Sequence, residues 1–379
     1  MSDNSKDLAQ LAAGREQAIV RTSIIGIIAN LFLAGFKAAV GLISNSIAVI
    51  LDAVNNLSDA LSSVITIIGT KLAGKLPDKK HPLGYGRLEY ISSLIISALV
   101  LYSGITSLIE SVKKIIHPEE ADYSVFTLVV IGAAVIVKLL LGSYVKAQGK
   151  KLNSGTLVAS GSDAFFDAIL SASVFVSAII FLIWGISLEA YVGVVIAIVI
   201  IKAGIELMLD TVNDILGQRA DAELTKSVKN ILTQEPDVRG AYDLLINNYG
   251  PNKNVASVHL ELPDTMTVEQ VDELTRRVET KVYKETGVIL TGVGVYSYNT
   301  QDKSVMKIRS EVQHLVLSHD WVIQFHGFYV DIEKKTMRFD IVLDFSIDPK
   351  EAMATLYQEV QTAFPDYTVT IVPDVDLAD

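Results

Sequence analysis

The sequence predicts a bundle of six transmembrane helices followed by a soluble α+β region. Half of the 379 residues are hydrophobic, and the mean hydropathy is +0.40. The apolar residues concentrate between Ile19 and Leu209, in segments of roughly 20 or more, the length that crosses about 30 Å of hydrocarbon. From Gln218 onward, charged residues alternate with short apolar runs, which is typical of a soluble α+β fold.

Six apolar segments define the predicted membrane domain, residues 19–211. We expect spanning helices at residues 19–43, 47–72, 88–115, 124–148, 155–183 and 188–211. Polar connections separate them, including Ser44–Ser46 and His117–Ser124. Residues 1–18 form a polar N-terminal arm in which no secretory signal pattern is visible.

Basic residues predict the orientation of this domain. They gather in the second and fourth connections, as Lys75, Lys79, Lys80, Arg87 and Lys150. Because Lys and Arg favour the cytoplasmic side of a membrane, both termini are expected to be cytoplasmic. This predicts a multi-pass protein of the cell membrane, in contact with the lipid bilayer.

The soluble half contains a duplicated order of elements. Residues 220–299 are predicted as helix, strand, strand, helix and strand, and residues 303–376 repeat this order. The pattern Thr267-Val-Glu-Gln270 is a capping box, and Asp348-Pro349 starts the corresponding helix of the second copy. We therefore expect two α-β-β-α-β modules in tandem, at residues 212–299 and 300–379.

Composition narrows the chemistry. The chain has no cysteine, so disulfides and thiolate metal ligands are excluded. The formal net charge of −11 gives no indication of a nucleic-acid partner, and none is expected.

Two pairs of polar residues lie inside the apolar segments. Asn55 and Asp59 are four residues apart in the second segment, as are Asp163 and Asp167 in the fifth. This spacing places both members of a pair on one helix face. Carboxylates at membrane depth are costly and usually mark an ion pathway. Two such faces turned toward each other would form a divalent-cation site with one amide and three carboxylates.

Interhelical hydrogen bonding is the alternative explanation of such polar residues. It explains Asn55 and the neighbouring serines equally well. It does not explain three aspartates, because burial and mutual repulsion would penalise them in the absence of a cation. Asp52 lies on nearly the same stripe of the second segment and is a further candidate ligand.

Four stretches of this chain resemble the cation diffusion facilitators, a family of divalent-metal exporters. They read SNSIAVILDAVNNLSDALSS, HPLGYGRLEYI, GSDAFFDAI and VHLEL, and the resemblance covers roughly residues 15–298. It implies a homodimer with six transmembrane helices and a cytoplasmic α+β ferredoxin-like domain, to which residues 300–379 would add a second ferredoxin-like module in tandem. It implies a transporter rather than an enzyme, with no cofactor. It also implies that Asn55, Asp59, Asp163 and Asp167 form the transport site.

The ligand set favours one cargo. All four donors are oxygens, which suit Mg, Ca and Mn better than Zn or Cu, whereas zinc-exporting relatives usually place a His in one pair. An Asn-Asp plus Asp-Asp set resembles the manganese-exporting branch. The resemblance thus implies efflux of Mn²⁺ from the cytoplasm by alternating access, in exchange for protons. Fe²⁺, Co²⁺ and Zn²⁺ remain alternative cargoes.

Accessory metal ligands are also candidates. Asp78 and His81 match a peripheral site of some relatives, although a third histidine position there is Tyr85, and an ordered loop is the alternative. His259 matches one ligand of the family's binuclear tail site. Its neighbouring positions fall near Tyr242, Tyr296 and Tyr298, which argues against that site. His314, His319 and His326 form no cluster at ligand spacing, so surface or packing roles are favoured for them.

The roles of two intramembrane lysines stay open at this point. Lys37 and Lys138 can pair with acids inside the bundle or extend toward the interface. Two other functions are also compatible with intramembrane aspartates. An intramembrane diaspartyl hydrolase would leave Asn55 and one aspartate without a role, and a metal-gated channel or sensor would use the bundle only as a relay.

Overall fold

The computed structural model describes residues 2–43, 47–117, 125–184 and 188–374. The chain divides into two compact units. The first is the helical part up to Gln218, with residues 249–252, and the second contains the remaining soluble part. The connections predicted at residues 44–46 and 118–124 lie outside the described residues. Each unit is described by itself below.

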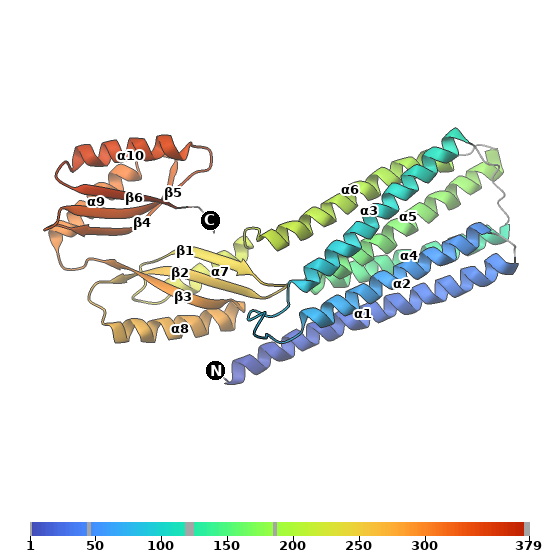
Figure 1. Cartoon of the computed structure of the whole chain (residues 1–379), viewed down its shortest axis with the longest axis horizontal. Helices are drawn as coiled ribbons and strands as arrows, with labels where there is room; N and C mark the ends of the chain where they lie inside the picture. Colours follow the sequence, from blue (N-terminus) through green and yellow to red (C-terminus); the bar gives the residue numbers. More distant parts are fainter. Residues whose placement is uncertain (1, 44–46, 118–124, 185–187, 375–379) are drawn as a thin grey trace. The chain divides into compact units, whose positions relative to one another are not determined.

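The first unit is a bundle of six long helices that run side by side (Figure 1). They are α1 (Ser2–Ile43), α2 (Ile47–Ala73), α3 (Leu88–Ile116), α4 (Val125–Lys151), α5 (Gly155–Trp184) and α6 (Glu189–Leu216). The polar arm predicted at residues 1–18 continues α1 as helix from Ser2 onward. The most extensive contacts join α4 to α5, α3 to α6 and α1 to α2.

Five of the described helices are long and apolar enough to cross a membrane. They cover Ala13–Val40, Leu88–Ile116, Leu128–Lys151, Gly155–Trp184 and Glu189–Leu216. This confirms an apolar helical membrane region, with spans close to five of the six predicted. Helix α2 is not among them, and side chains near its start lie outside the described part of the structure. Its passage across the membrane stays a prediction.

A buried ion pair fastens one end of the bundle. Arg15 on α1 donates two hydrogen bonds to the carboxylate of Glu89 on α3, at 2.9 and 3.0 Å. Its Nε also donates to the carbonyl of Leu152, between α4 and α5, at 2.7 Å. Glu89 is only 1% exposed. A bidentate, buried pair is among the stronger side-chain contacts, so this arginine holds three parts of the bundle together.

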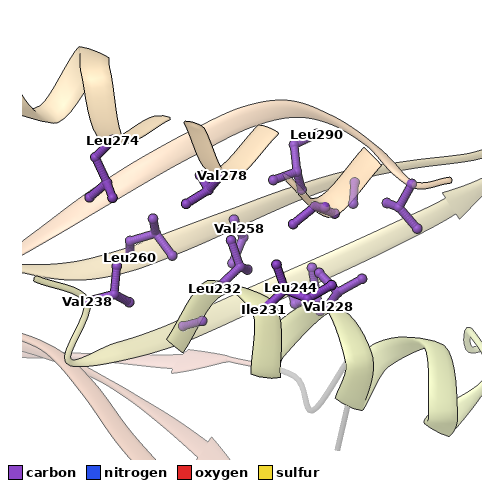
Figure 2. Packing of buried hydrophobic residues seen from close by; sticks show 14 of the residues in the cluster. Val228, Ile231, Leu232, Val238, Leu244, Val258, Leu260, Leu274, Val278 and Leu290 are labelled. Atoms are coloured by element: carbon purple, nitrogen blue, oxygen red, sulfur yellow. The ribbon is translucent and has the colours of Figure 1, made fainter. Parts of the chain in front are cut away.

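The second unit begins with the first α-β-β-α-β set of elements. These are α7 (Ala222–Thr233), β1 (Gly240–Asn248), β2 (Asn254–Pro263), α8 (Val268–Thr286) and β3 (Ile289–Tyr298). The sheet order is β1-β2-β3, with β1 and β2 antiparallel and β2 and β3 parallel. The apolar faces of both helices and the sheet form one core, with Leu232, Leu260 and Val278 fully buried (Figure 2). The predicted capping box at Thr267 is present.

The second set repeats this order and topology. It contains α9 (Lys303–Val316), β4 (Val322–Asp331), β5 (Thr336–Leu343), α10 (Pro349–Ala363) and β6 (Thr368–Asp374). Its sheet order is β4-β5-β6, again antiparallel and then parallel. Asp348 caps α10 through the backbone N–H groups of Lys350 and Glu351. The two sets therefore share one element order and one sheet topology.

The repeat has its own core, which predicts the effect of one substitution. Phe339 on β5 is fully buried, and its ring lies 5.2 Å from that of Phe325. We expect Phe339→Ala to lower the free energy of opening of the β4–β6 sheet by about 3–5 kcal/mol. Amide hydrogen exchange on the intact chain measures this, and the β1–β3 sheet should keep its exchange rates because its core is separate.

Tyr329 provides the matched control. It lies on β4 of the same sheet but is 60% exposed, so Tyr329→Ala should change the opening free energy by roughly 0.5 kcal/mol or less. Equal effects of the two substitutions would contradict the assignment of Phe339 to a separate core.

Candidate metal site

The two predicted polar pairs lie on facing helices. Asn55 and Asp59 occupy one face of α2, and Asp163 and Asp167 occupy one face of α5. Asp59 is 7% exposed and Asp167 is 8% exposed. The amide nitrogen of Asn55 donates to Oδ2 of Asp167 across the two helices, at 3.3 Å. The structure therefore brings residues 112 positions apart into one polar centre, as the sequence predicts.

A lysine from a third helix lies between the carboxylates. Nζ of Lys138 on α4 donates to Oδ2 of Asp59 at 2.8 Å and to Oδ2 of Asp167 at 2.7 Å. The side chain of Lys138 is 3% exposed. Of the two roles that the sequence leaves open for this lysine, the structure selects pairing with acids inside the bundle.

Asp163 completes the set of four predicted ligands. It is partly buried and lies within electrostatic range of Asp59, Asp167 and Lys138. Among the residues that the structure describes, it forms no hydrogen bond or ion pair. Lys37 on α1 is 2% exposed and lies within electrostatic range of Asp59. The acidic centre is thus flanked by two buried cationic side chains.

Close helix packing positions Lys138 against α5. A Cβ added to Gly142, one turn after Lys138, would lie 2.7 Å from the backbone nitrogen of Phe165. A Cβ added to Gly161 would lie 2.4 Å from the backbone nitrogen of Lys146. Small residues allow this approach of two membrane helices. The backbone of α4 therefore passes directly beside the stretch of α5 that carries Asp163 and Asp167.

The charge balance of the centre suits a divalent cation. Three ionised aspartates outnumber the ammonium groups of Lys138 and Lys37, so the centre keeps a net negative charge for a bound cation to neutralise. At low dielectric, uncompensated charges a few ångströms apart interact strongly, so the centre gains most from a doubly charged guest. The donors are carboxylate and amide oxygens, with neither imidazole nor thiolate among the contacts described.

Asp78 and His81 lie together in the loop between α2 and α3. Nδ1 of His81 is 3.4 Å from Oδ1 of Asp78. The Asp78 carboxylate also accepts hydrogen bonds from the Tyr85 hydroxyl and from the backbone N–H groups of His81 and Lys80. These bonds hold the pKa of Asp78 at about 2. The carboxylate therefore organises the loop, and metal binding by Asp78 and His81 stays a prediction.

Two other predicted ligands have different outcomes. Asp52 lies on α2, and its side chain is outside the described part of the structure. His259 lies on β2, where Nδ1 is 2.8 Å from Oδ2 of Asp243 and the ring stacks on Tyr296. Asp243 lies next to Tyr242 in the sequence, and no motif marks its carboxylate as a ligand.

Comparison with known proteins identifies the family. A family model described as the cation efflux transmembrane domain matches residues 23–216, and one described as the cation efflux protein cytoplasmic domain matches residues 220–291. The first model alone covers more than half of the chain. The chain therefore belongs to the cation efflux family of transporters, the cation diffusion facilitators.

Individual relatives differ in the metals that their names carry. The chain is 27% identical over 259 residues to an uncharacterised transporter of Methanocaldococcus jannaschii, which covers 68% of this chain and 91% of the relative. It is 26% identical over 283 residues to the manganese efflux system protein MneP of Bacillus subtilis. That match covers 73% of this chain and 94% of MneP. It is 24% identical over 271 residues to a cadmium, cobalt and zinc/H(+)-K(+) antiporter of Bacillus velezensis. That match covers 71% of this chain and 85% of the antiporter. Family membership thus establishes cation efflux and leaves the metal open.

The position of Lys138 generates a prediction. Lys138→Met keeps the aliphatic stem but removes the ammonium between Asp59 and Asp167. We expect the metal-free variant to lose about 3 kcal/mol of stability, because breaking a buried charge pair leaves carboxylates uncompensated. We also expect Mn²⁺ to stabilise the variant more than it stabilises the unaltered protein, because no resident cation competes. Thermal unfolding in detergent, with and without Mn²⁺, measures both effects.

Lys202→Met is the matched control, since the Lys202 side chain is 78% exposed on α6 and pairs only loosely with Glu206 at 3.7 Å. It should leave both quantities unchanged. An equal Mn²⁺-induced shift in Lys138→Met and in the unaltered protein would show that the ammonium does not compete with metal.

Proposed function

We propose that this protein exports divalent metal cations, most favourably Mn²⁺, from the cytoplasm by alternating access. The observation that carries the proposal is the convergence of Asn55, Asp59, Asp163 and Asp167 on one polar centre between α2 and α5, in which Asp59 and Asp167 are buried. Carboxylates at membrane depth are typical of ion pathways. The four residues are the proposed transport site, and Asp52 would extend it along α2.

The donor set supports manganese over zinc. Hard oxygen ligands suit Mg, Ca and Mn, whereas zinc favours nitrogen and sulfur donors. The relative MneP carries manganese in its name, while the Bacillus velezensis relative carries cadmium, cobalt and zinc. Fe²⁺, Co²⁺ and Zn²⁺ therefore remain the alternative cargoes.

Protons and the Lys138 ammonium neutralise the carboxylates when no metal ion is bound. Protons arriving from the opposite side of the membrane compete with the metal for the same three carboxylates, which would drive its release by exchange. A metal ion entering between Asp59 and Asp167 displaces the Lys138 ammonium from its contacts. When the metal leaves, the ammonium returns, so the emptied carboxylates do not face each other without compensation.

The remaining architecture is part of the same proposal. Helix α2 would be the sixth span, since a polar stripe facing the bundle interior is compatible with a membrane helix. An even number of spans would place both termini in the cytoplasm of a cell-membrane protein. The match to a cytoplasmic domain model whose name refers to a dimer supports a homodimer. Residues 212–299 and 300–379 would be two ferredoxin-like modules.

Membership of a transporter family weakens the hydrolase alternative, which also gives Asn55 no role. A metal-gated channel or sensor remains the second candidate. The two candidates differ in flux: a transporter gives saturable Mn²⁺ movement that follows an imposed pH gradient, and a channel gives non-saturating movement that ignores it.

Asp163 provides the sharpest test of the transport site. It forms no ion pair with Lys138, so Asp163→Asn leaves the contacts of Lys138 with Asp59 and Asp167 in place. Outer-shell substitutions at metal sites cost about 10–100-fold, and loss of a direct ligand should cost at least about 100-fold in Mn²⁺ flux into proteoliposomes under a pH gradient. Ser173→Ala on the same helix should transport normally, because its hydroxyl only donates to its own helix backbone, at Leu170. Normal flux through Asp163→Asn would refute the site.

Asn55 provides a test of selectivity. Asn55→His introduces a nitrogen donor into an all-oxygen set, which should favour Zn²⁺. We expect the ratio of Zn²⁺ to Mn²⁺ flux to rise by about tenfold, equivalent to about 1.4 kcal/mol. Asn55→Asp keeps the oxygen donor and should leave the ratio near that of the unaltered protein. Equal ratios in the two variants would mean that Asn55 does not contribute to metal choice.

A further inference from the structure

The second unit contains a cluster of imidazole and carboxylate groups that transport does not use. Asp243 on β1, His326 on β4 and Asp374 on β6 bring one potential ligand atom each within 4.8 Å of the others. Nε2 of His326 lies 2.8 Å from Oδ1 of Asp243 and 3.9 Å from Oδ2 of Asp374. These separations suit ligands that share one ion at about 2.0–2.2 Å.

Two β-bulges direct the central residues. The pairing of β1 with β2 shifts register between Tyr242 and Leu245, and Asp243 adopts a φ of 54°, in the left-handed region that non-glycine residues rarely adopt. The pairing of β4 with β5 shifts register between His326 and Tyr329. Bulges change the direction of side chains and are often found beside functional sites. Both side chains of the closest contact therefore come from irregular backbone.

The contact between these two side chains leaves their polar atoms unsatisfied. His326 is 1% exposed, and neither of its ring nitrogens forms a hydrogen bond to the described residues. Oδ1 of Asp243 is buried and also lacks a hydrogen bond. The two atoms lie at ion-pair distance without hydrogen-bond alignment. Buried polar atoms normally have a partner, so this pair is unusual unless an ion beside the two atoms binds both.

The other oxygen of Asp243 is held by separate groups. Oδ2 accepts a hydrogen bond from the Tyr296 hydroxyl at 2.6 Å and lies 2.8 Å from Nδ1 of His259. These two contacts orient the carboxylate, with Oδ1 directed at His326. Contacts of this kind to a ligating carboxylate fix its position in a metal site.

Aromatic contacts join the cluster across the two sets of elements. The His326 ring stacks on Tyr242 at 5.0 Å, and the Tyr296 hydroxyl also donates to Asp340 at 3.1 Å. Tyr242 and Tyr296 belong to the first sheet, and His326 and Asp340 belong to the second. An ion in the cluster would therefore be bound by both α-β-β-α-β sets at once.

We propose that Asp243, His326 and Asp374 bind a divalent transition-metal ion that links the two α-β-β-α-β sets of the soluble unit. One imidazole and two carboxylates form a mixed nitrogen and oxygen set that suits Mn²⁺, Fe²⁺, Co²⁺ or Zn²⁺. Occupancy joins β1 of the first sheet to β4 and β6 of the second, so the metal content of the surroundings controls how firmly the second set is attached. This site is separate from the transport site and does not depend on it.

Histidine coordination distinguishes the two sites in one experiment. The transport site has only oxygen donors, so nitrogen bound to Mn²⁺ comes from a histidine outside it, which the substitutions below identify. We expect pulsed electron paramagnetic resonance of the full chain in detergent, titrated with Mn²⁺, to reveal ¹⁴N coupling at one ion per chain. Asp163→Asn should retain this coupling, even if the proposed transport function is wrong.

Substitutions then identify the histidine that gives rise to the ¹⁴N coupling. His326→Phe, which keeps a ring against Tyr242, should abolish it, and Asp374→Asn should weaken Mn²⁺ binding at this site at least tenfold. His314→Phe is the matched control, because His314 is exposed on α9, and it should retain the coupling. Absence of ¹⁴N coupling in the unaltered chain, or its survival in His326→Phe, would overturn the proposal. Circular dichroism of each variant verifies folding, and Asp374→Asn keeps the test valid if His326→Phe does not fold.

Discussion

Lys138 binds two aspartates from different helices with one ammonium group, and the candidate metal site depends on this contact. Three carboxylates this deep in a helical bundle would repel one another, and burial would add to the cost. The ammonium at 2.7 and 2.8 Å from Asp167 and Asp59 compensates part of that charge without removing the preference for a divalent guest. Through these two carboxylates it also holds α2, α4 and α5 together, so the candidate ligands lie close to one another.

Helical periodicity was sufficient to predict the faces of the site. A four-residue step places Asn55 beside Asp59, and Asp163 beside Asp167, whatever the tertiary structure. The partner of Asp59 could not be obtained in this way, because Lys138 lies 79 residues further along the chain and either pairing or snorkelling satisfies a lone intramembrane lysine. The alternation of elements in the soluble half was equally readable, since caps and apolar periodicity are local signals.

The cluster of Asp243, His326 and Asp374 could not be predicted from the sequence, because irregular backbone positions its side chains. Asp243 reaches His326 only because β1 and β4 each contain a bulge, and regular alternation along a strand gives no sign of one. His326 alone looked like a packing residue, and it is indeed buried and stacked on Tyr242. Only the structure shows that its ring nitrogens lack hydrogen bonds and that Asp243 of the first sheet lies beside one of them. Local sequence patterns thus predict the regular helices and strands, whereas the bulges in β1 and β4 are known only from the structure.

The close passage of α4 beside α5 has a mechanical consequence. With Gly142 and Gly161 at the contact, any side chain at either position would meet the backbone of the other helix, so this close approach requires both glycines. The most extensive contacts of α2 are with α1. Asn55 and Asp59 therefore belong to the α1–α2 pair, and Lys138, Asp163 and Asp167 belong to the α4–α5 pair. A small shear between the two pairs would change every distance across the centre at the same time, so the affinity for a bound ion would change in a single movement of the backbone.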